Sequence, residues 1–300
     1  MNSPRSAKPA RPRGSAGPAR TGPAGIAPVS IGIVGLGTIG RQLIAAARKD
    51  AAAAAPGPPP LVVAGVTSRD GEKARSHLET LRDPPPYLAL DNLIARSALV
   101  VEAAGGAVVP DLARRAFAAG RDLMVISAGA LLDRPEILDL ARATGCRLIV
   151  PSGAIAGLDG IKSACQGEVE RVTMTTRKPP ESLEGAPYLV ERGISLRGLT
   201  GEREVFRGSA REACRGFPAN VNVAAAVSLA GIGADRTQIR ILAVPGLKQN
   251  CHDVEVIGEF GELLISIRNT PTENPRTGRL TALSIWRTLR QAVDPVRIGT

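Results

Sequence analysis

Aromatic residues are scarce in this chain of 300 residues, where phenylalanine, tyrosine and tryptophan together make up 2%. Single-stranded nucleic acid is bound largely by stacking bases on aromatic side chains, so this scarcity argues against a specific nucleic-acid partner despite the formal net charge of +10. Long apolar runs are also missing. The alanine-rich stretch 51–55 ends at Pro56, well short of the roughly 20 residues that a membrane helix needs. We therefore expect no membrane partner and no specific nucleic-acid partner.

Acidic residues are absent from the first 28 residues, which contain five basic ones. Half of the net positive charge therefore lies in this segment. It is rich in proline, alanine and glycine and has almost no large apolar side chain, so it cannot bury enough surface to offset the entropy of ordering. It lacks the apolar core of a secretory signal, which argues against targeting. We predict that residues 1–28 form a disordered basic tail.

Cysteine occurs only four times and never in a C-x-x-C pair. The positions are Cys146, Cys165, Cys214 and Cys251. Their spacing is not that of a zinc site, so we predict no metal centre. Reduced and mostly buried thiols are typical of a cytoplasmic protein, which is the compartment we expect.

Apolar runs alternate with helix-like segments from residue 29 to about 150. Continuous valine, isoleucine and leucine strands that alternate with amphipathic helices are typical of a parallel sheet covered on both faces. The apolar runs are 31–34, 61–66, 99–103, 123–127 and 147–150. We predict an α/β fold in which 29–150 form a Rossmann-type, doubly wound dinucleotide-binding domain. The segment 51–60, rich in proline and alanine, is expected to be a surface loop.

The pattern changes after Pro151, where strand-like stretches outnumber helices. We predict that residues 151–277 form an α+β domain with a mixed or antiparallel sheet, which would bind substrate and mediate dimerisation. The last segment, 278–300, is predicted to contain a helix that packs back on the Rossmann domain. A chain that is 44% hydrophobic has enough apolar side chains for two cores.

The glycine turn after the first apolar run carries the strongest single motif. Gly35, Gly37 and Gly40 have the G-x-G-x-x-G spacing, between a strand-like segment and a helix-like one. Each glycine meets a separate steric demand: the tight turn, the close approach of backbone to pyrophosphate, and the packing of helix on strand. The N–H groups at the start of the helix, at Thr38 and Ile39, would bind the diphosphate. This order predicts a dinucleotide site.

The residues after the second strand bear on the choice of coenzyme. NAD-selective folds usually place an acid there to bind the ribose 2′-hydroxyl. This chain has Ser68 and Arg69, which suit a 2′-phosphate because guanidinium and phosphate form charge-assisted bonds. NADP is therefore the preferred coenzyme. The alternative is NAD, with Asp70 binding the hydroxyl.

Only two histidines are available as a base near neutral pH. His77 lies in a polar helix-like segment and is expected to be a solvated surface residue. His252 lies just before a strand of alternating character and is the better catalytic candidate. An apolar helix of small residues begins near Asn220 and Asn222, whose amides could bond a carboxamide.

In these segments the chain resembles the L-aspartate dehydrogenase family. The matching segments are VSIGIVGLGTIGR, LVVEAAGG, VISAGAL, PSGAIAGLDGI, TTRKPP, VFRGSAREACRGFPANVNVAAAVSLAG, NCHDVEVIGEFG and ENPRTG. They extend over nearly all of 29–290. The glycine turn is generic, whereas the ordered set from PSGAIAGLDG onward is specific.

The resemblance implies an NAD(P)-dependent oxidoreductase that interconverts L-aspartate and iminoaspartate, which hydrolyses to oxaloacetate and ammonia. It also implies that Ala130 and Asn222 contact the coenzyme and that His252 is catalytic. Relatives of this kind supply pyridine-nucleotide biosynthesis or degrade aspartate, and they are usually homodimers through the sheet of the second domain.

The residue types agree with this chemistry. The ammonium of aspartate must lose a proton before the Cα hydride can leave, and a histidine is suited to accept it. The two substrate carboxylates need cations, which Arg177 and Lys178 could supply, with Arg276 as a further candidate. The alternative for Arg177 and Lys178 is a solvated strand end.

Two departures from the family pattern affect the predicted pocket. Val244 precedes Pro245 where relatives usually have an aspartate, and Gly278 ends the segment 274–278 where they usually have a serine. Three other functions remain open: a dehydrogenase for another amino or dicarboxylic acid, a non-enzymatic NADP-binding regulator, and an enzyme with Cys251 as nucleophile. The last is disfavoured because adjacent residues on a strand point to opposite faces, so Cys251 and His252 could not share a proton.

Overall fold

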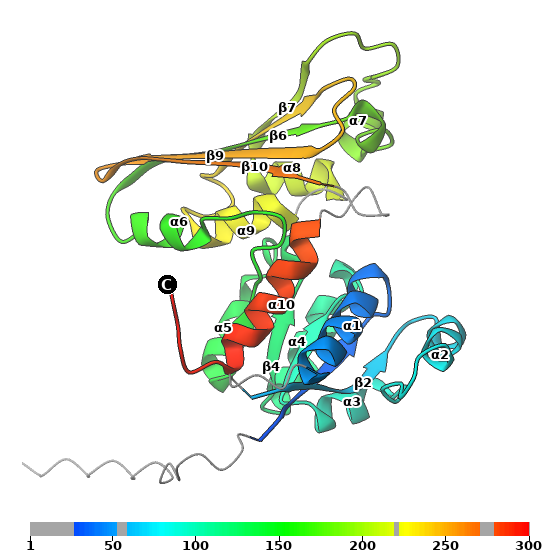
Figure 1. The fold of residues 1–300 in the computed structure, drawn as a ribbon. Helices are drawn as coiled ribbons and strands as arrows, with labels where there is room; N and C mark the ends of the chain where they lie inside the picture. The colour runs from blue at the N-terminus through cyan, green and yellow to red at the C-terminus, as the bar shows by residue number, and fades with distance from the viewer. Residues whose placement is uncertain (1–26, 53–58, 219–221, 271–278, 300) are drawn as a thin grey trace, which may run out of the picture.

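The computed structural model describes residues 27–52, 59–218, 222–270 and 279–299. Two five-stranded sheets form the two halves of the molecule, one above the other in Figure 1. Most of the predicted basic tail and part of the loop predicted at 51–60 lie outside these residues. No helix among them is long and apolar enough to cross a membrane.

The first sheet is parallel throughout and has the strand order β2-β1-β3-β4-β5. Its strands are β1 (Val29–Val34), β2 (Leu61–Thr67), β3 (Leu99–Glu102), β4 (Asp122–Val125) and β5 (Leu148–Ile149). They coincide with the five predicted apolar runs. Such strands are apolar along their whole length because helices bury them on both sides. The Rossmann-type fold class is confirmed.

Helices cover both faces of this sheet. They are α1 (Thr38–Ala52), α2 (Gly71–Glu79), α3 (Leu90–Arg96), α4 (Val109–Ala118) and α5 (Pro135–Thr144). Leu43 of α1 packs in one buried cluster with Ile31 and Ile33, and Phe117 of α4 packs in another with Val100 on the opposite face. The helix α10 (Arg279–Val293) joins the α1 side of the sheet.

The second sheet is mixed and has the order β10-β9-β6-β8-β7. Its strands are β6 (Val169–Lys178), β7 (Arg203–Ser209), β8 (Gln238–Ala243), β9 (Asn250–Gly258) and β10 (Gly261–Asn269). The β6–β8 pair is parallel and the other pairs are antiparallel, which confirms the predicted mixed sheet.

Helices lie on one face of the second sheet, between it and the first half of the molecule (Figure 1). They are α6 (Leu158–Ala164), α8 (Ala210–Gly216) and α9 (Asn222–Ala230), while the short α7 (Pro187–Glu191) contacts α8. Ala213 and Ala225 pack with Val172 and Val254 in one buried core. Figure 1 shows α6, α8 and α9 on the same side of this sheet.

Candidate active site

The glycine turn joins β1 to α1 at the carboxyl edge of the first sheet. Gly35 has a φ of +105°, and a Cβ there would lie 2.4 Å from the carbonyl oxygen of Ala103. A Cβ on Gly40 would lie 2.1 Å from the oxygen of Gly35. Around Gly37, by contrast, nothing among the described residues lies within 4 Å of such a Cβ. Two glycines therefore close the turn, and the third leaves room for a pyrophosphate beside the helix start.

Ser68 and Arg69 follow β2 at the same edge, with the Arg69 side chain exposed. Tyr87 donates from its hydroxyl to the oxygen of Ser68 at 2.9 Å, which anchors this turn. Asp70 is the N-cap of α2: its Oδ1 accepts from the N–H of Lys73 at 3.0 Å. This carboxylate is therefore already used in capping.

The last residue of β3, Glu102, is fully buried among backbone N–H groups. Its carboxylate accepts from Ala104 and Gly105 in the turn after β3, and from the N–H and hydroxyl of Ser127 after β4. The side chain thus joins the two turns that follow these strands. Sequence reasoning did not single it out, although an acid that ends an otherwise apolar strand was a visible signal.

Asn222 connects the two halves of the molecule at this edge. It is the first residue of α9, and its Oδ1 accepts from the N–H of Gly129 at 3.3 Å. Gly129 and Ala130 belong to the 3₁₀ turn η2 (Ala128–Leu131), which follows β4. A Cβ on Gly106 would lie 3.1 Å from the Cβ of Ala130, so the turns after β3 and β4 also touch. The structure therefore brings Ala130 and Asn222 together beside the predicted dinucleotide crevice.

His252 lies on β9, on the face of the second sheet that packs against α8 and α9, and is 2% exposed. It is opposite Thr176 of β6, whose Oγ1 lies 3.1 Å from His252 Nδ1. Burial lowers the pKa of His252 to about 4, with a further lowering by the charge of Lys178 and an opposing effect of Asp253. The imidazole is therefore neutral at pH 7.

Lys178, at the end of β6, shares this face with Thr176. The two line a small cavity together with Phe217 and Ala224. Burial lowers the pKa of the Lys178 ammonium to about 8, so it is still mostly charged at pH 7. A buried cation next to a neutral imidazole can bind an anionic group of a small ligand.

Arg177 lies on the other face of the same strand. It forms ion pairs with Asp253 and, at 3.3 Å, with Glu202. The structure therefore does not bring Arg177 together with His252, because neighbouring residues on a strand point to opposite faces. Cys251 is paired with Arg177 in the register and likewise lies on the opposite face from His252. Arg276 and Gly278 lie outside the described residues.

Comparison with known proteins gives consistent matches over both halves of the chain. A family model described as "Aspartate dehydrogenase, C-terminal" matches residues 159–292, and one described as "Homoserine dehydrogenase, NAD binding domain" matches residues 35–151. L-aspartate dehydrogenase 3 of Bordetella bronchiseptica is 43% identical over 238 residues, which cover 79% of this chain and 88% of the relative. L-aspartate dehydrogenase of Methanosarcina mazei is 48% identical over 220 residues, which cover 72% and 81%.

The chain belongs to the L-aspartate dehydrogenase family. The resemblance seen in the sequence is thereby confirmed. Among solved structures, aspartate dehydrogenase from Thermotoga maritima has 27% identity and a TM-score of 0.66, covering 90% of this chain and 99% of that one. Homoserine dehydrogenase from Thiobacillus denitrificans, at 16% identity and a TM-score of 0.59, shares the fold.

As a member of the aspartate dehydrogenase family, the chain is an oxidoreductase with a pyridine-nucleotide coenzyme. The residues at the crevice fit such a coenzyme. The open side of Gly37 and the N-terminus of α1 suit the pyrophosphate, and the turn at Ser68 suits the adenosine ribose. Val244, the departure from the family pattern, donates its N–H to the Lys178 oxygen at 2.8 Å, so this position lies beside the candidate substrate-binding lysine.

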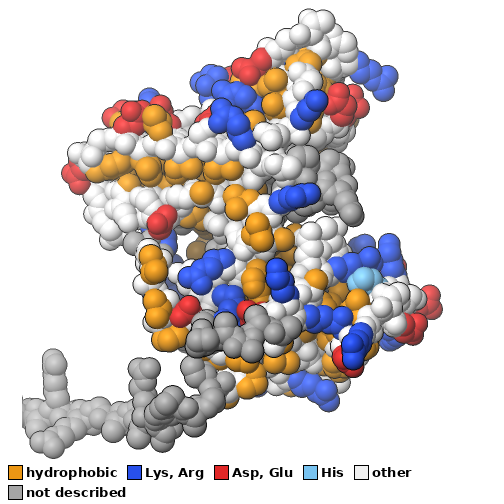
Figure 2. All heavy atoms as spheres, viewed as in Figure 1, with side chains coloured by type: hydrophobic (Ala, Val, Ile, Leu, Met, Phe, Trp, Pro, Cys, Tyr) orange, Lys and Arg blue, Asp and Glu red, His pale blue; other side chains and the backbone are white. Residues whose placement is uncertain are grey.

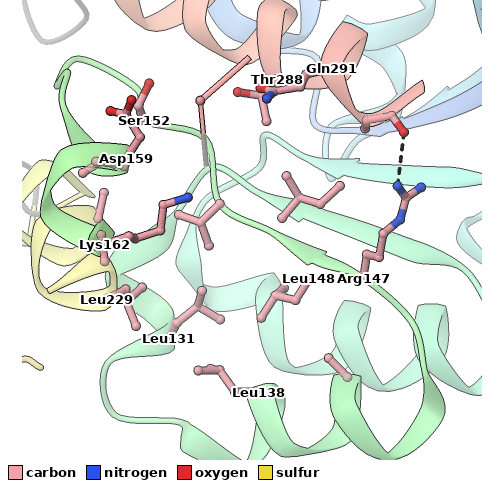
Figure 3. A pocket seen from close by; sticks show the side chains of 18 of the residues that line it. Leu131, Leu138, Arg147, Leu148, Ser152, Asp159, Lys162, Leu229, Thr288 and Gln291 are labelled. Atoms are coloured by element: carbon pink, nitrogen blue, oxygen red, sulfur yellow. Dashed lines mark hydrogen bonds between the residues drawn. The ribbon is translucent and has the colours of Figure 1, made fainter. Parts of the chain in front are cut away.

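A larger cavity of about 850 Å³ lies along β5, between α5, α6, α9 and α10. Figure 3 shows leucine side chains on its floor and Lys162 pointing into it. Arg147, at its edge, donates to the oxygen of Ala292 at 3.1 Å. None of the predicted site residues that the structure describes lines this cavity. The cavity is therefore separate from the candidate active site of this member of the aspartate dehydrogenase family.

Proposed function

We propose that this protein oxidises L-aspartate to iminoaspartate with NADP, and that it also catalyses the reverse reductive amination. The observation that carries the proposal is the arrangement of His252, Thr176 and Lys178 on one face of the second sheet. That face packs against α9, and Asn222 of α9 is hydrogen bonded to the turn at the dinucleotide crevice. The names of the relatives supply the substrate.

His252 is the proposed proton acceptor for the substrate ammonium. When the proton of the neutral imidazole is on Nδ1, it can be donated to Thr176 Oγ1, which leaves the Nε2 lone pair for the substrate. A substrate carboxylate near Lys178 would offset the positive charge that helps to lower the pKa of His252. Substrate binding would thus make the imidazole a stronger base where it is needed.

Lys178 is the proposed partner of a substrate carboxylate. It is buried, and the charge of a buried ammonium interacts strongly with an anion because little water screens it. A bound pyridine nucleotide would supply the acceptor for the hydride of Cα. Burial of His252 and Lys178 limits water at this place, which would protect iminoaspartate from hydrolysis before release. Arg276 remains a further candidate for the second carboxylate.

NADP is the proposed coenzyme because of the groups after β2. Asp70 caps α2, so the residue that would have favoured NAD is engaged elsewhere, while Arg69 is exposed at the turn. Figure 2 shows Lys and Arg side chains near α1, and Asp and Glu side chains at the outer edge where α2 lies. The Lys and Arg side chains near the turn favour the additional phosphate of NADP.

We further propose that the protein is a homodimer in the cytoplasm. The face of the second sheet away from α8 and α9 presents Leu264, which is 67% exposed. A second copy is the proposed occupant of this face. The four free cysteines suit a reducing compartment. Light scattering with wild type and Leu264→Asp tests the dimer: loss of dimer in the variant supports it, and a monomeric wild type contradicts it.

The activity itself is tested by following nicotinamide absorbance with L-aspartate and each coenzyme in turn. Glutamate, homoserine and malate are assayed separately as alternative substrates. We expect reduction with L-aspartate to be fastest, and faster with NADP than with NAD. Faster reduction with another acid would show a related dehydrogenase, and coenzyme binding without reduction of any kind would show a regulator.

A further inference from the structure

Glu102 is a buried carboxylate to which the mechanism assigns no role. It is the last residue of β3, 0% exposed, and lies on the central strand of the first sheet. Burying a carboxylate is costly unless hydrogen bonds replace the lost water. A carboxylate buried at this position therefore requires a structural or functional reason.

The hydrogen bonds of Glu102 come from two separate turns. Its Oε1 accepts from the N–H groups of Ala104 and Gly105, at 2.8 and 2.7 Å, and from the hydroxyl of Ser127 at 3.1 Å. Its Oε2 accepts from the N–H of Ser127 at 2.9 Å. One side chain thus holds the turn after β3 against the turn after β4.

Both turns make further contacts around the coenzyme crevice. The oxygen of Ala103 lies only 2.4 Å from the position that a Cβ of Gly35 would take, so the turn after β3 packs closely against the glycine turn. The turn after β4 continues into Gly129, which donates to Asn222 of the second half of the molecule. Glu102 is therefore the central member of a series of contacts from the glycine turn to α9.

The position of this series indicates which part of the coenzyme it serves. In a sheet of order 2-1-3-4-5 the strand order reverses between β1 and β3, and ligands bind in the crevice at that point. The residues after β2 receive the adenosine ribose. The nicotinamide half must therefore extend to the other side, over the turns that follow β3 and β4.

We propose that Glu102 is a positioning residue that sets the affinity for the nicotinamide half of the coenzyme. It acts through the turns at Gly105 and Ser127, because its hydrogen bonds fix the position of one turn relative to the other. This inference rests on coenzyme binding and does not depend on the substrate being aspartate. In Glu102→Gln, an amide N–H would face a backbone N–H in place of an acceptor, so at least one of the two turns must move.

The test compares binding of the whole coenzyme with binding of its adenosine half. NADPH binding is measured by fluorescence, and 2′,5′-ADP binding by calorimetry; NADH and ADP are used if the wild type prefers them. For Glu102→Gln we expect NADPH to bind about tenfold more weakly, as for loss of one buried charge-assisted hydrogen bond, with 2′,5′-ADP affinity unchanged. Wild-type NADPH affinity, or an equal loss for both ligands, would overturn the proposal.

Asp122→Asn is the matched control. Asp122 begins the neighbouring strand β4 at the opposite edge of the sheet, and its carboxylate accepts from Arg147 at 2.7 and 2.8 Å. The same charge change there should leave both affinities unchanged, and a selective loss of NADPH affinity would contradict the assignment to Glu102.

Ser127→Ala keeps the protein testable if Glu102→Gln does not fold. It removes one of the four hydrogen bonds and should weaken NADPH binding to a smaller extent, again without an effect on 2′,5′-ADP. No change in NADPH affinity would contradict the proposal. A wild type that binds NADPH but does not oxidise aspartate would overturn the proposed substrate while leaving this test intact.

Discussion

Thr176 and His252 face each other across the β6–β9 ladder, with Thr176 Oγ1 at 3.1 Å from His252 Nδ1. A histidine that is fixed at Nδ1 can offer only Nε2 to a ligand. The relationship therefore defines both the orientation of the imidazole and the nitrogen that we expect to take the substrate proton.

His252→Ala should lower kcat by about 10²- to 10⁴-fold, the usual contribution of a positioned general base. The affinity for NADPH should be nearly unchanged, because the glycine turn lies on the other sheet. Steady-state kinetics and coenzyme fluorescence measure the two effects. His77→Ala, on the partly exposed α2, is the control and should behave as wild type. Wild-type turnover in His252→Ala would remove this residue from the mechanism.

Lys178→Met should raise KM for L-aspartate and at the same time stabilise the fold. The pKa of Lys178 is about 8 in the folded protein and 10.5 in the unfolded chain. As the pH falls from 10.5 to 8 the unfolded chain is protonated first, so below pH 8 this lysine destabilises the fold, by about 3 kcal/mol at most. Removing the ammonium should therefore raise Tm at pH 7.

Arg177→Met is the matched control for Lys178→Met, because it removes the neighbouring cation from the opposite face. It should leave KM for L-aspartate unchanged and lower Tm slightly through loss of its ion pairs. If Arg177→Met raised KM and Lys178→Met did not, the assignment of the substrate cation would be reversed.

The pH profile of kcat/KM should be broad. On the acid side it depends on neutral His252, whose pKa is about 4 in the free enzyme, so activity should persist well below pH 6.5. On the basic side it should fall as Lys178 loses its proton near pH 8. An acid limb near pH 6.5, in an enzyme shown to be folded by circular dichroism at each pH, would contradict the burial of His252. Thr176→Val should lower kcat without changing the pH at which kcat/KM falls on the basic side.

Arg69→Ala should weaken NADP binding by about ten- to a hundredfold and leave NAD binding almost unchanged, because only NADP carries the 2′-phosphate. Titration of both coenzymes measures this difference. Arg82→Ala, which removes a side chain that is 96% exposed beyond the end of α2, is the control. Equal losses for NADP and NAD in Arg69→Ala would show that this guanidinium does not recognise the phosphate.

The strands of the first sheet could be predicted because buried parallel strands are continuous apolar runs in the sequence. The sheet face on which an individual side chain lies could not be predicted. Arg177 and Lys178 are adjacent in the chain, and only the register of β6 with β9 shows that Lys178 shares a face with His252. A shift of the register by one residue would have exchanged the two, so no composition rule could choose between them.

The roles of the acids depended even more on tertiary structure. Asp70, the alternative candidate for the ribose hydroxyl, caps α2, and this role became visible only with the observed start of that helix. Two of the four hydrogen bonds that Glu102 accepts come from Ser127, 25 residues later in the chain. Contacts between turns that are this far apart in the sequence depend on the order of the strands in the sheet, and the sequence pattern does not contain that order.

If the hydride leaves Cα of L-aspartate in a site built around His252, a deuterium at Cα must be transferred to the coenzyme. The enzyme is incubated with L-aspartate carrying deuterium at Cα and with NADP, and the reduced coenzyme is analysed by mass spectrometry. We predict that each reduced nicotinamide carries one deuterium and that His252→Ala forms it far more slowly. Reduced coenzyme without deuterium would show that the hydride does not come from Cα of aspartate, and equal rates in the two proteins would show that His252 does not take part.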